Sequence, residues 1–101
     1  LASFEREEPQ MRAYVISRFL YRLNTSPALR ERWQANRAAT LRESEWALSA
    51  EEIDLIEAMD FRRLYQLGIH PLLLTALANC SGVPVPQMIA AIRDLARDPV
   101  G

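Results

Sequence analysis

A single histidine and a single cysteine, His70 and Cys80, are the side chains of this sequence best suited to metal binding or nucleophilic chemistry. Non-haem iron usually takes two histidines and a carboxylate, and structural zinc takes about four Cys or His ligands. One residue of each type completes neither set, so we expect no metal and no other cofactor on this chain. A catalytic pair is also unfavourable, because the helix between the two residues would hold them roughly 15 Å apart. Cys80 is better interpreted as a small core residue.

The other residue types that carry chemistry in enzymes have local structural explanations here. Glu51 and Glu52 are adjacent acids, but they lie at a predicted helix start, where the helix dipole favours negative charge. The glycines are scattered, so the sequence has neither a phosphate-binding glycine loop nor a nucleophile elbow. His70 stands before Pro71 at another predicted helix start, where it either caps the helix or faces a ligand, and capping is the simpler interpretation. We therefore assign no catalytic residue to this chain.

The composition is that of one small domain. The chain has 101 residues, half of them hydrophobic, which is enough for one modest core. No apolar run approaches the roughly 18 residues of a membrane-spanning helix. A formal net charge of -1 gives no general attraction to nucleic acid or to anionic lipid. A lone cysteine excludes an internal disulfide and favours a reducing, cytoplasmic setting.

The absence of lysine is a second feature of the composition. All twelve basic residues are arginine, whose planar guanidinium pairs with carboxylates inside a subunit or between subunits. Codon bias in a GC-rich genome is the simpler explanation.

Helical periodicity organises the first half of the chain. Across Pro9 to Leu23, apolar residues recur at spacings of three and four and predict a first helix with one buried face. Ser26 and Pro27 supply an N-cap and a first-turn proline for a second, arginine-rich helix, which we expect to continue into the low forties. Ser49 and Glu52 then form a capping box that predicts a third helix.

The second half is divided by turn residues. Asp60 is predicted to cap a short helix that ends before Gly68, and Pro71 to open the apolar helix Leu72 to Cys80, which should be the most buried. A loop over residues 81–86 leads to a last amphipathic helix. Its predicted apolar face consists of Met88, Ile89, Ile92 and Leu95.

These patterns predict an all-α fold, a compact bundle of about five to six short helices. We expect one domain over residues 9–98 and a frayed N-terminal arm over residues 1–8. Helical spacing favours core packing for Trp33, whereas Trp46 lies in a turn and is left open between packing and recognition. A helix-turn-helix interpretation of residues 77–89 is disfavoured, because the second helix starts with Pro84-Val85-Pro86-Gln87 and its arginines come only at Arg93 and Arg97.

Five segments, taken in order, resemble a known family. They are Tyr14 to Leu23, Ala28 to Trp33, Leu48 to Glu52, Ala58 to Phe61 and Leu67 to Pro71. Their order and spacing are similar to those of the small, alpha subunit of protocatechuate 4,5-dioxygenase and its relatives, the type II extradiol ring-cleaving dioxygenases. The resemblance extends over most of the chain, from about Met11 to Leu95, and no single motif carries it.

The resemblance implies that two parts of an enzyme have different roles. A larger catalytic beta subunit, or a fused neighbouring domain, binds Fe(II) and inserts oxygen into an aromatic diol, and the alpha element packs over that active site and shapes its substrate pocket. Two turns would overhang the pocket with apolar residues and one polar group: Ile69, His70, Val83, Pro84, Val85 and Pro86. Because arginine and aromatic anchors dominate interfaces, we expect four residues of the second helix at the subunit contact: Arg30, Arg32, Trp33 and Arg37.

The chain departs from the family pattern after the glycine turn. Members acting on protocatechuate tend to have an Asn and an aromatic residue there, whereas this chain reads Ile69-His70-Pro71-Leu72. The identity of the cleaved ring is therefore not carried over. The alternative function is a free-standing helical interaction module that keeps the fold without the enzyme.

Overall fold

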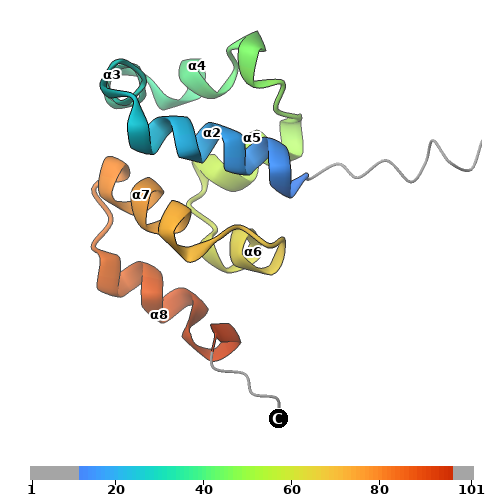
Figure 1. Cartoon of the computed structure of the whole chain (residues 1–101), viewed down its shortest axis with the longest axis vertical. Coiled ribbons are helices and arrows are strands. Elements are labelled where there is room, and N and C mark those ends of the chain that lie inside the picture. Colours follow the sequence, from blue (N-terminus) through green and yellow to red (C-terminus); the bar gives the residue numbers. More distant parts are fainter. Residues whose placement is uncertain (1–11, 97–101) are drawn as a thin grey trace, which may run out of the picture.

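The computed structural model describes residues 12–96, which form seven α-helices and one short 3-10 helix (Figure 1). In chain order these are α2 (Ala13–Thr25), α3 (Pro27–Ala35), α4 (Arg37–Leu41), η1 (Ser44–Trp46), α5 (Ala50–Glu57), α6 (Phe61–Gln66), α7 (Pro71–Ser81) and α8 (Val85–Ala96). The all-α prediction is confirmed. The predicted arm over residues 1–8 and the start of the predicted first helix lie outside the described residues. No helix within residues 12–96 is long and apolar enough to cross a membrane.

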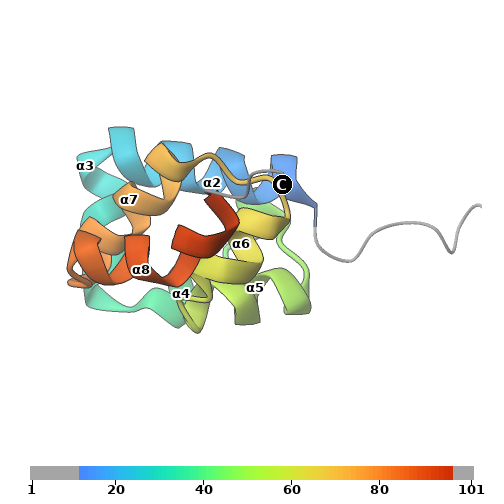
Figure 2. The ribbon, with the colours of Figure 1, turned by 90° about the horizontal axis from the view of Figure 1, so that it is seen from below.

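Helices α2 and α7 lie side by side at the centre of the molecule (Figure 1). Helix α2 buries five apolar residues on one face, which confirms the face predicted from spacing: Val15, Ile16, Phe19, Leu20 and Leu23. Helices α3 and α4 lie on the α2 side of this pair, and α6 and α8 lie on the α7 side (Figure 1). Figure 2 shows that α2 and α5 lie on opposite sides of the molecule, with the core between them.

The core beside α2 is aromatic. The Phe19 ring lies 5.8 Å from the Trp33 ring and 5.1 Å from the Trp46 ring, measured between centroids, and the second pair meets edge to face. Tilted and edge-to-face contacts are favourable arrangements for aromatic rings. Trp33 and Trp46 are both buried, so core packing is confirmed for Trp33 and holds for Trp46 as well.

The predicted second helix is interrupted at Asn36. This residue has an extended backbone, and its side-chain oxygen accepts a hydrogen bond from Ala39 N at 3.0 Å. An asparagine side chain that bonds to the following backbone N–H groups competes with helix continuation. The expectation of one helix into the low forties was therefore wrong, and the extra break contributes to a helix count higher than predicted.

Two features of the second half of the chain differ from the sequence-based predictions. Helix α7 is not buried along its whole length, because Leu72 is 72% exposed. The loop over residues 81–86 is shorter than predicted, since α8 begins at Val85 and includes Pro86. A first-turn proline does not remove a hydrogen bond from α8, because N–H groups in that turn have no helical partner. On α8, Met88 and Ile92 face the core, whereas Ile89 is 45% exposed.

Candidate functional site

The turn between α6 and α7 is closed by a pair of backbone hydrogen bonds of the Schellman type. Gly68 N donates to Tyr65 O at 3.0 Å, and Ile69 N donates to Leu64 O at 3.1 Å. Gly68 has a φ of +103°, a conformation that strains a residue with a side chain. Ile69, which we expected at a pocket wall, is only 1% exposed and packs in the core. Of the predicted pocket residues in this turn, His70 is therefore the one that a ligand can reach.

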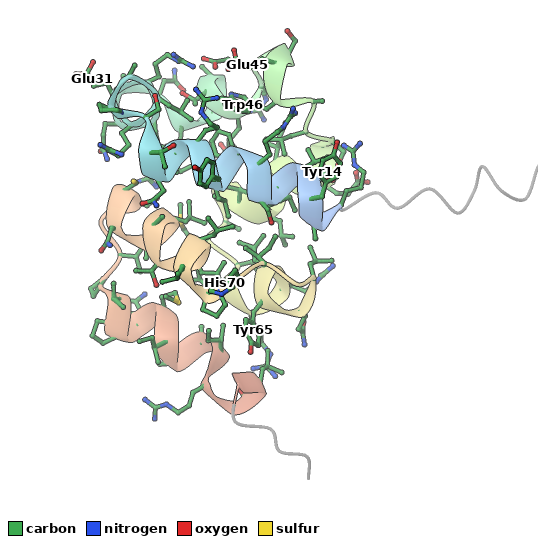
Figure 3. The ribbon with its side chains drawn as sticks, viewed as in Figure 1. Tyr14, Glu31, Glu45, Trp46, Tyr65 and His70 are labelled. Carbon is green, nitrogen blue, oxygen red and sulfur yellow. The ribbon has the colours of Figure 1, made fainter. Side chains whose placement is uncertain are left out.

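His70 is exposed and caps α7. Its Nδ1 accepts a hydrogen bond from Leu72 N at 3.0 Å, which satisfies one N–H of the first helical turn. The capping interpretation is confirmed. Because Nδ1 acts as an acceptor, the neutral ring carries its proton on Nε2, and that N–H is the group the side chain can offer to a ligand. Figure 3 shows His70 at this end of α7, with Tyr65 of α6 near the same turn.

The turn between α7 and α8 repeats the same geometry. Gly82 has a φ of +76°, and Val83 N donates to Ala78 O at 2.9 Å. Val83 and Val85 are half-buried and pack against the core of this chain. Pro84 and Pro86 are the exposed members of the predicted group.

The two turns lie at opposite ends of α7. At about 1.5 Å of rise per residue, the eleven residues of α7 separate them by roughly 16 Å. One aromatic ring cannot contact both, so the structure does not bring the six predicted pocket residues together. His70 and the prolines at 84 and 86 belong to separate surfaces.

The arginines expected at a subunit contact all have partners inside the chain. Arg30 Nη1 donates to Asn24 O at 2.8 Å, at the end of α2. Arg32 Nη2 lies 3.1 Å from Glu43 Oε1. Arg37 Nη2 donates to Ser81 O at 2.9 Å, at the end of α7.

Trp33 cannot contact a partner subunit, because it is fully buried. Its Nε1 donates to Ser81 Oγ at 3.1 Å, and the Arg37 guanidinium lies 5.4 Å from its ring centroid. Gln34 Nε2 also donates to Cys80 O. Together, these side chains of α3 and α4 satisfy carbonyl and hydroxyl groups at the C-terminal end of α7, which otherwise lack helical partners. Their role in this structure is to hold α7 in place.

A buried ion pair that the sequence did not reveal joins Arg12 to Glu52. The Glu52 side chain is fully buried and accepts hydrogen bonds from Arg12 N at 2.6 Å, Arg12 Nη2 at 3.0 Å and Ser49 N at 2.7 Å. Burial raises the pKa of Glu52, but these hydrogen bonds outweigh it, so the pKa lies below its ordinary value. The capping box was visible locally. The arginine was not, because it lies forty positions away in the chain.

The surroundings of Cys80 disfavour its reactive form. Burial raises the pKa of the Cys80 thiol, although nearby Arg30 opposes the shift, and a raised pKa disfavours the nucleophilic thiolate. Within residues 12–96, no three His, Cys, Asp or Glu side chains are placed to hold a metal ion. The described residues therefore do not fit an iron site.

Two exposed tyrosines on α2 were also not among the residues predicted from the sequence. Tyr14 is 73% exposed and Tyr21 is 57% exposed. They are seven positions apart, so they lie on one face of α2, opposite its buried face. That spacing was available in the sequence, and large aromatic residues on a polar helix face are its signal.

The comparisons with known proteins give one match. Over residues 16–98 the chain matches the family described as "Aromatic-ring-opening dioxygenase LigAB, LigA subunit". The matched range begins within α2 and includes every later helix of the structure. Comparisons with curated proteins and with solved structures found no match.

Proposed function

The chain belongs to the LigA family of aromatic-ring-opening dioxygenase subunits, and we propose that it acts as a non-catalytic subunit that packs over the active site of a larger catalytic subunit. The family match carries this proposal, because it extends over most of the chain and describes a subunit of a two-part enzyme.

The placement of three acidic side chains supports a non-catalytic role. Asp60 caps α6. Glu52 pairs with Arg12, and Asp94 Oδ1 lies 2.8 Å from Arg62 Nη1. A general acid or base needs a group that can reach the substrate and exchange a proton, whereas these groups are occupied in holding helices together.

The catalytic iron belongs to the larger subunit in this proposal. The described residues of this chain do not fit an Fe(II) site. Fe(II) on the partner would supply the oxygen chemistry, and the substrate would be an aromatic diol cleaved in the extradiol manner. This chain would contribute shape, exclusion of water and one hydrogen-bond donor.

We assign the pocket edge to the turn before α7. Its exposed residues pair a donor, Nε2–H of His70, with an apolar surface, Leu72, which is 72% exposed. Such a combination orients a planar ring, because the apolar part excludes water and one hydrogen bond fixes the direction. At the other turn, the exposed members of the predicted group, Pro84 and Pro86, have no side-chain hydrogen-bonding group.

Co-purification tests the assembly. The full chain, carrying an affinity tag, would be co-expressed with a large dioxygenase subunit encoded beside it. We expect a stable complex whose iron content equals that of the large subunit alone. A chain that elutes free of the large subunit at moderate salt would contradict the proposal and favour an independent interaction module.

Two substitutions at His70 separate the pocket role from the capping role. His70→Ala removes both the ring and the cap, whereas His70→Asn keeps a strong N-cap residue without the ring. Loss of one substrate hydrogen bond should change the ratio of kcat/KM for two competing catechols by about three- to tenfold in both variants. Pro84→Ala, at the other turn, is the matched control and should leave the ratio unchanged. A normal ratio in His70→Asn would place this turn outside the pocket.

A further inference from the structure

The outward face of α2 is the most exposed aromatic surface among residues 12–96. Tyr14 and Tyr21 occupy it with 73% and 57% exposure. Arg18 and Arg22 are also exposed on this side of the helix. The buried face of α2 already fills the core, so packing among residues 12–96 does not explain two exposed tyrosines.

The residue types match those of interfaces. Tyrosine and arginine are enriched among the residues that contribute most to protein–protein binding, because each combines a large contact area with directional hydrogen bonding. The helix is also held in place before any partner binds. Its N-terminal end is tied to α5 through Arg12 and Glu52, and Arg18 Nη2 donates to Trp46 O at 3.3 Å. A rigid surface loses little conformational entropy on binding.

The charge that α2 itself contributes to this face has one sign. Helix α2 contains arginines and no acidic residue. Helix α5 contains no basic residue, and its Glu51, Asp54 and Glu57 are exposed. Because α2 and α5 lie on opposite sides of the molecule (Figure 2), the basic tyrosine face and the acidic face point in different directions. A partner surface that complements α2 must therefore supply carboxylates.

The turn that carries His70 lies on the α2 side of the molecule (Figure 2). Helices α2 and α7 are packed side by side, and Figure 2 shows α2 and the turn before α7 along the same edge of the molecule, away from α5. A subunit that places its active site against His70 would also meet α2.

We propose that the face of α2 defined by Tyr14, Arg18, Tyr21 and Arg22 docks on an acidic surface of the catalytic subunit. This inference rests on the proposed function, since it names the face that makes the contact. The α3 arginines, which the sequence favoured, are the competing face, although each already has a partner within the chain.

The test measures binding of the full chain to the immobilised large subunit. In one variant, Tyr14→Ala and Tyr21→Ala are combined, which keeps a strong helix former at two positions outside the core. A second variant is Arg22→Glu. The matched control combines Asp54→Asn and Glu57→Gln, two exposed changes on α5. Circular dichroism of each variant should show unchanged helix content.

We expect the double tyrosine variant to bind at least about tenfold more weakly, as interface aromatic residues do when truncated. Arg22→Glu should slow association at low salt and reduce its salt dependence. The α5 control should bind like the original chain.

Three results would overturn the inference. If the original chain binds and the tyrosine variant binds equally well, the contact does not lie on α2, and the proposed function still stands. Failure of the original chain to bind would remove both proposals. A dimer of the isolated chain that the tyrosine substitutions convert to a monomer, with subunit binding unchanged, would make α2 a contact between copies of this chain.

Discussion

Replacement of the buried Glu52 by alanine should be among the most destabilising single substitutions in this protein. The change removes the acceptor for Arg12 N at 2.6 Å, Arg12 Nε at 3.1 Å, Arg12 Nη2 at 3.0 Å and Ser49 N at 2.7 Å. Removing one partner of a buried ion pair costs about 3–5 kcal/mol. The Arg12 side chain is 36% exposed, so water can solvate part of its charge, and we expect the lower end, about 3 kcal/mol.

Urea unfolding followed by circular dichroism measures this cost. For a domain of this size, about 3 kcal/mol lowers Tm by about 12–24 °C. Glu52→Gln keeps an acceptor oxygen and a capping-box side chain, and should lose about 1–2 kcal/mol. Glu51→Ala is the control, because Glu51 is exposed in the same helical turn and should cost about 0.5 kcal/mol. Equal losses for Glu51→Ala and Glu52→Ala would show that the contacts between Glu52 and Arg12 do not stabilise the fold.

The same pair predicts a dependence on pH. Burial raises the pKa of Glu52, but hydrogen bonds from Arg12 and Ser49 lower it by more than burial raises it. In the folded state the pKa of Glu52 therefore lies below its ordinary value of 4.5. A carboxyl with a depressed folded pKa contributes stability above its unfolded pKa, and this contribution is lost as the pH falls through the folded pKa. The difference in unfolding free energy between the original chain and Glu52→Gln should therefore be full at pH 7 and shrink below about pH 4.5. A difference that stays constant down to pH 2 would contradict the assignment.

Three further outcomes follow from single contacts. His70→Ala should lose about 1 kcal/mol of unfolding free energy and His70→Asn only a few tenths, because asparagine still caps α7; equal losses would exclude the cap. Arg37→Ala should cost about 1 kcal/mol, since it leaves Ser81 O without its donor and Trp33 without its cation; a urea midpoint unchanged from the original would argue against this. Alkylation of Cys80 by iodoacetamide at pH 7 should be at least about tenfold slower in the folded chain than in urea, because burial raises its pKa; equal rates would show that the thiol is accessible.

Local signals in the sequence predicted most of the helix boundaries. Ser49 and Asp60 cap helices as expected, and Gly68 and Gly82 adopt positive φ angles at helix ends. These interactions join residues within a few positions of each other, so their geometry follows from the sequence alone. Asn36 offered the same kind of signal, but it stood inside a pattern that also suited a continuous helix.

Contacts between distant residues could not be predicted in the same way. The pairing of Arg12 with Glu52 depends on how α2 meets α5, and the burial of Ile69 depends on how the turn before α7 packs. The separation of the two turns was different, because it follows from helix length. The rise per residue that keeps His70 away from Cys80 also keeps His70 away from Pro84.

We propose that this chain acts on ring cleavage only through a catalytic partner. The most direct measurement is the rate of catechol ring opening, followed by oxygen uptake, for the chain alone, for the Fe(II)-loaded large subunit alone, and for the two mixed in equal amounts. We predict no turnover by the chain alone and a higher kcat/KM in the mixture than for the large subunit alone. Turnover by the isolated chain, or a large subunit whose kcat/KM is the same with and without it, would contradict the claim.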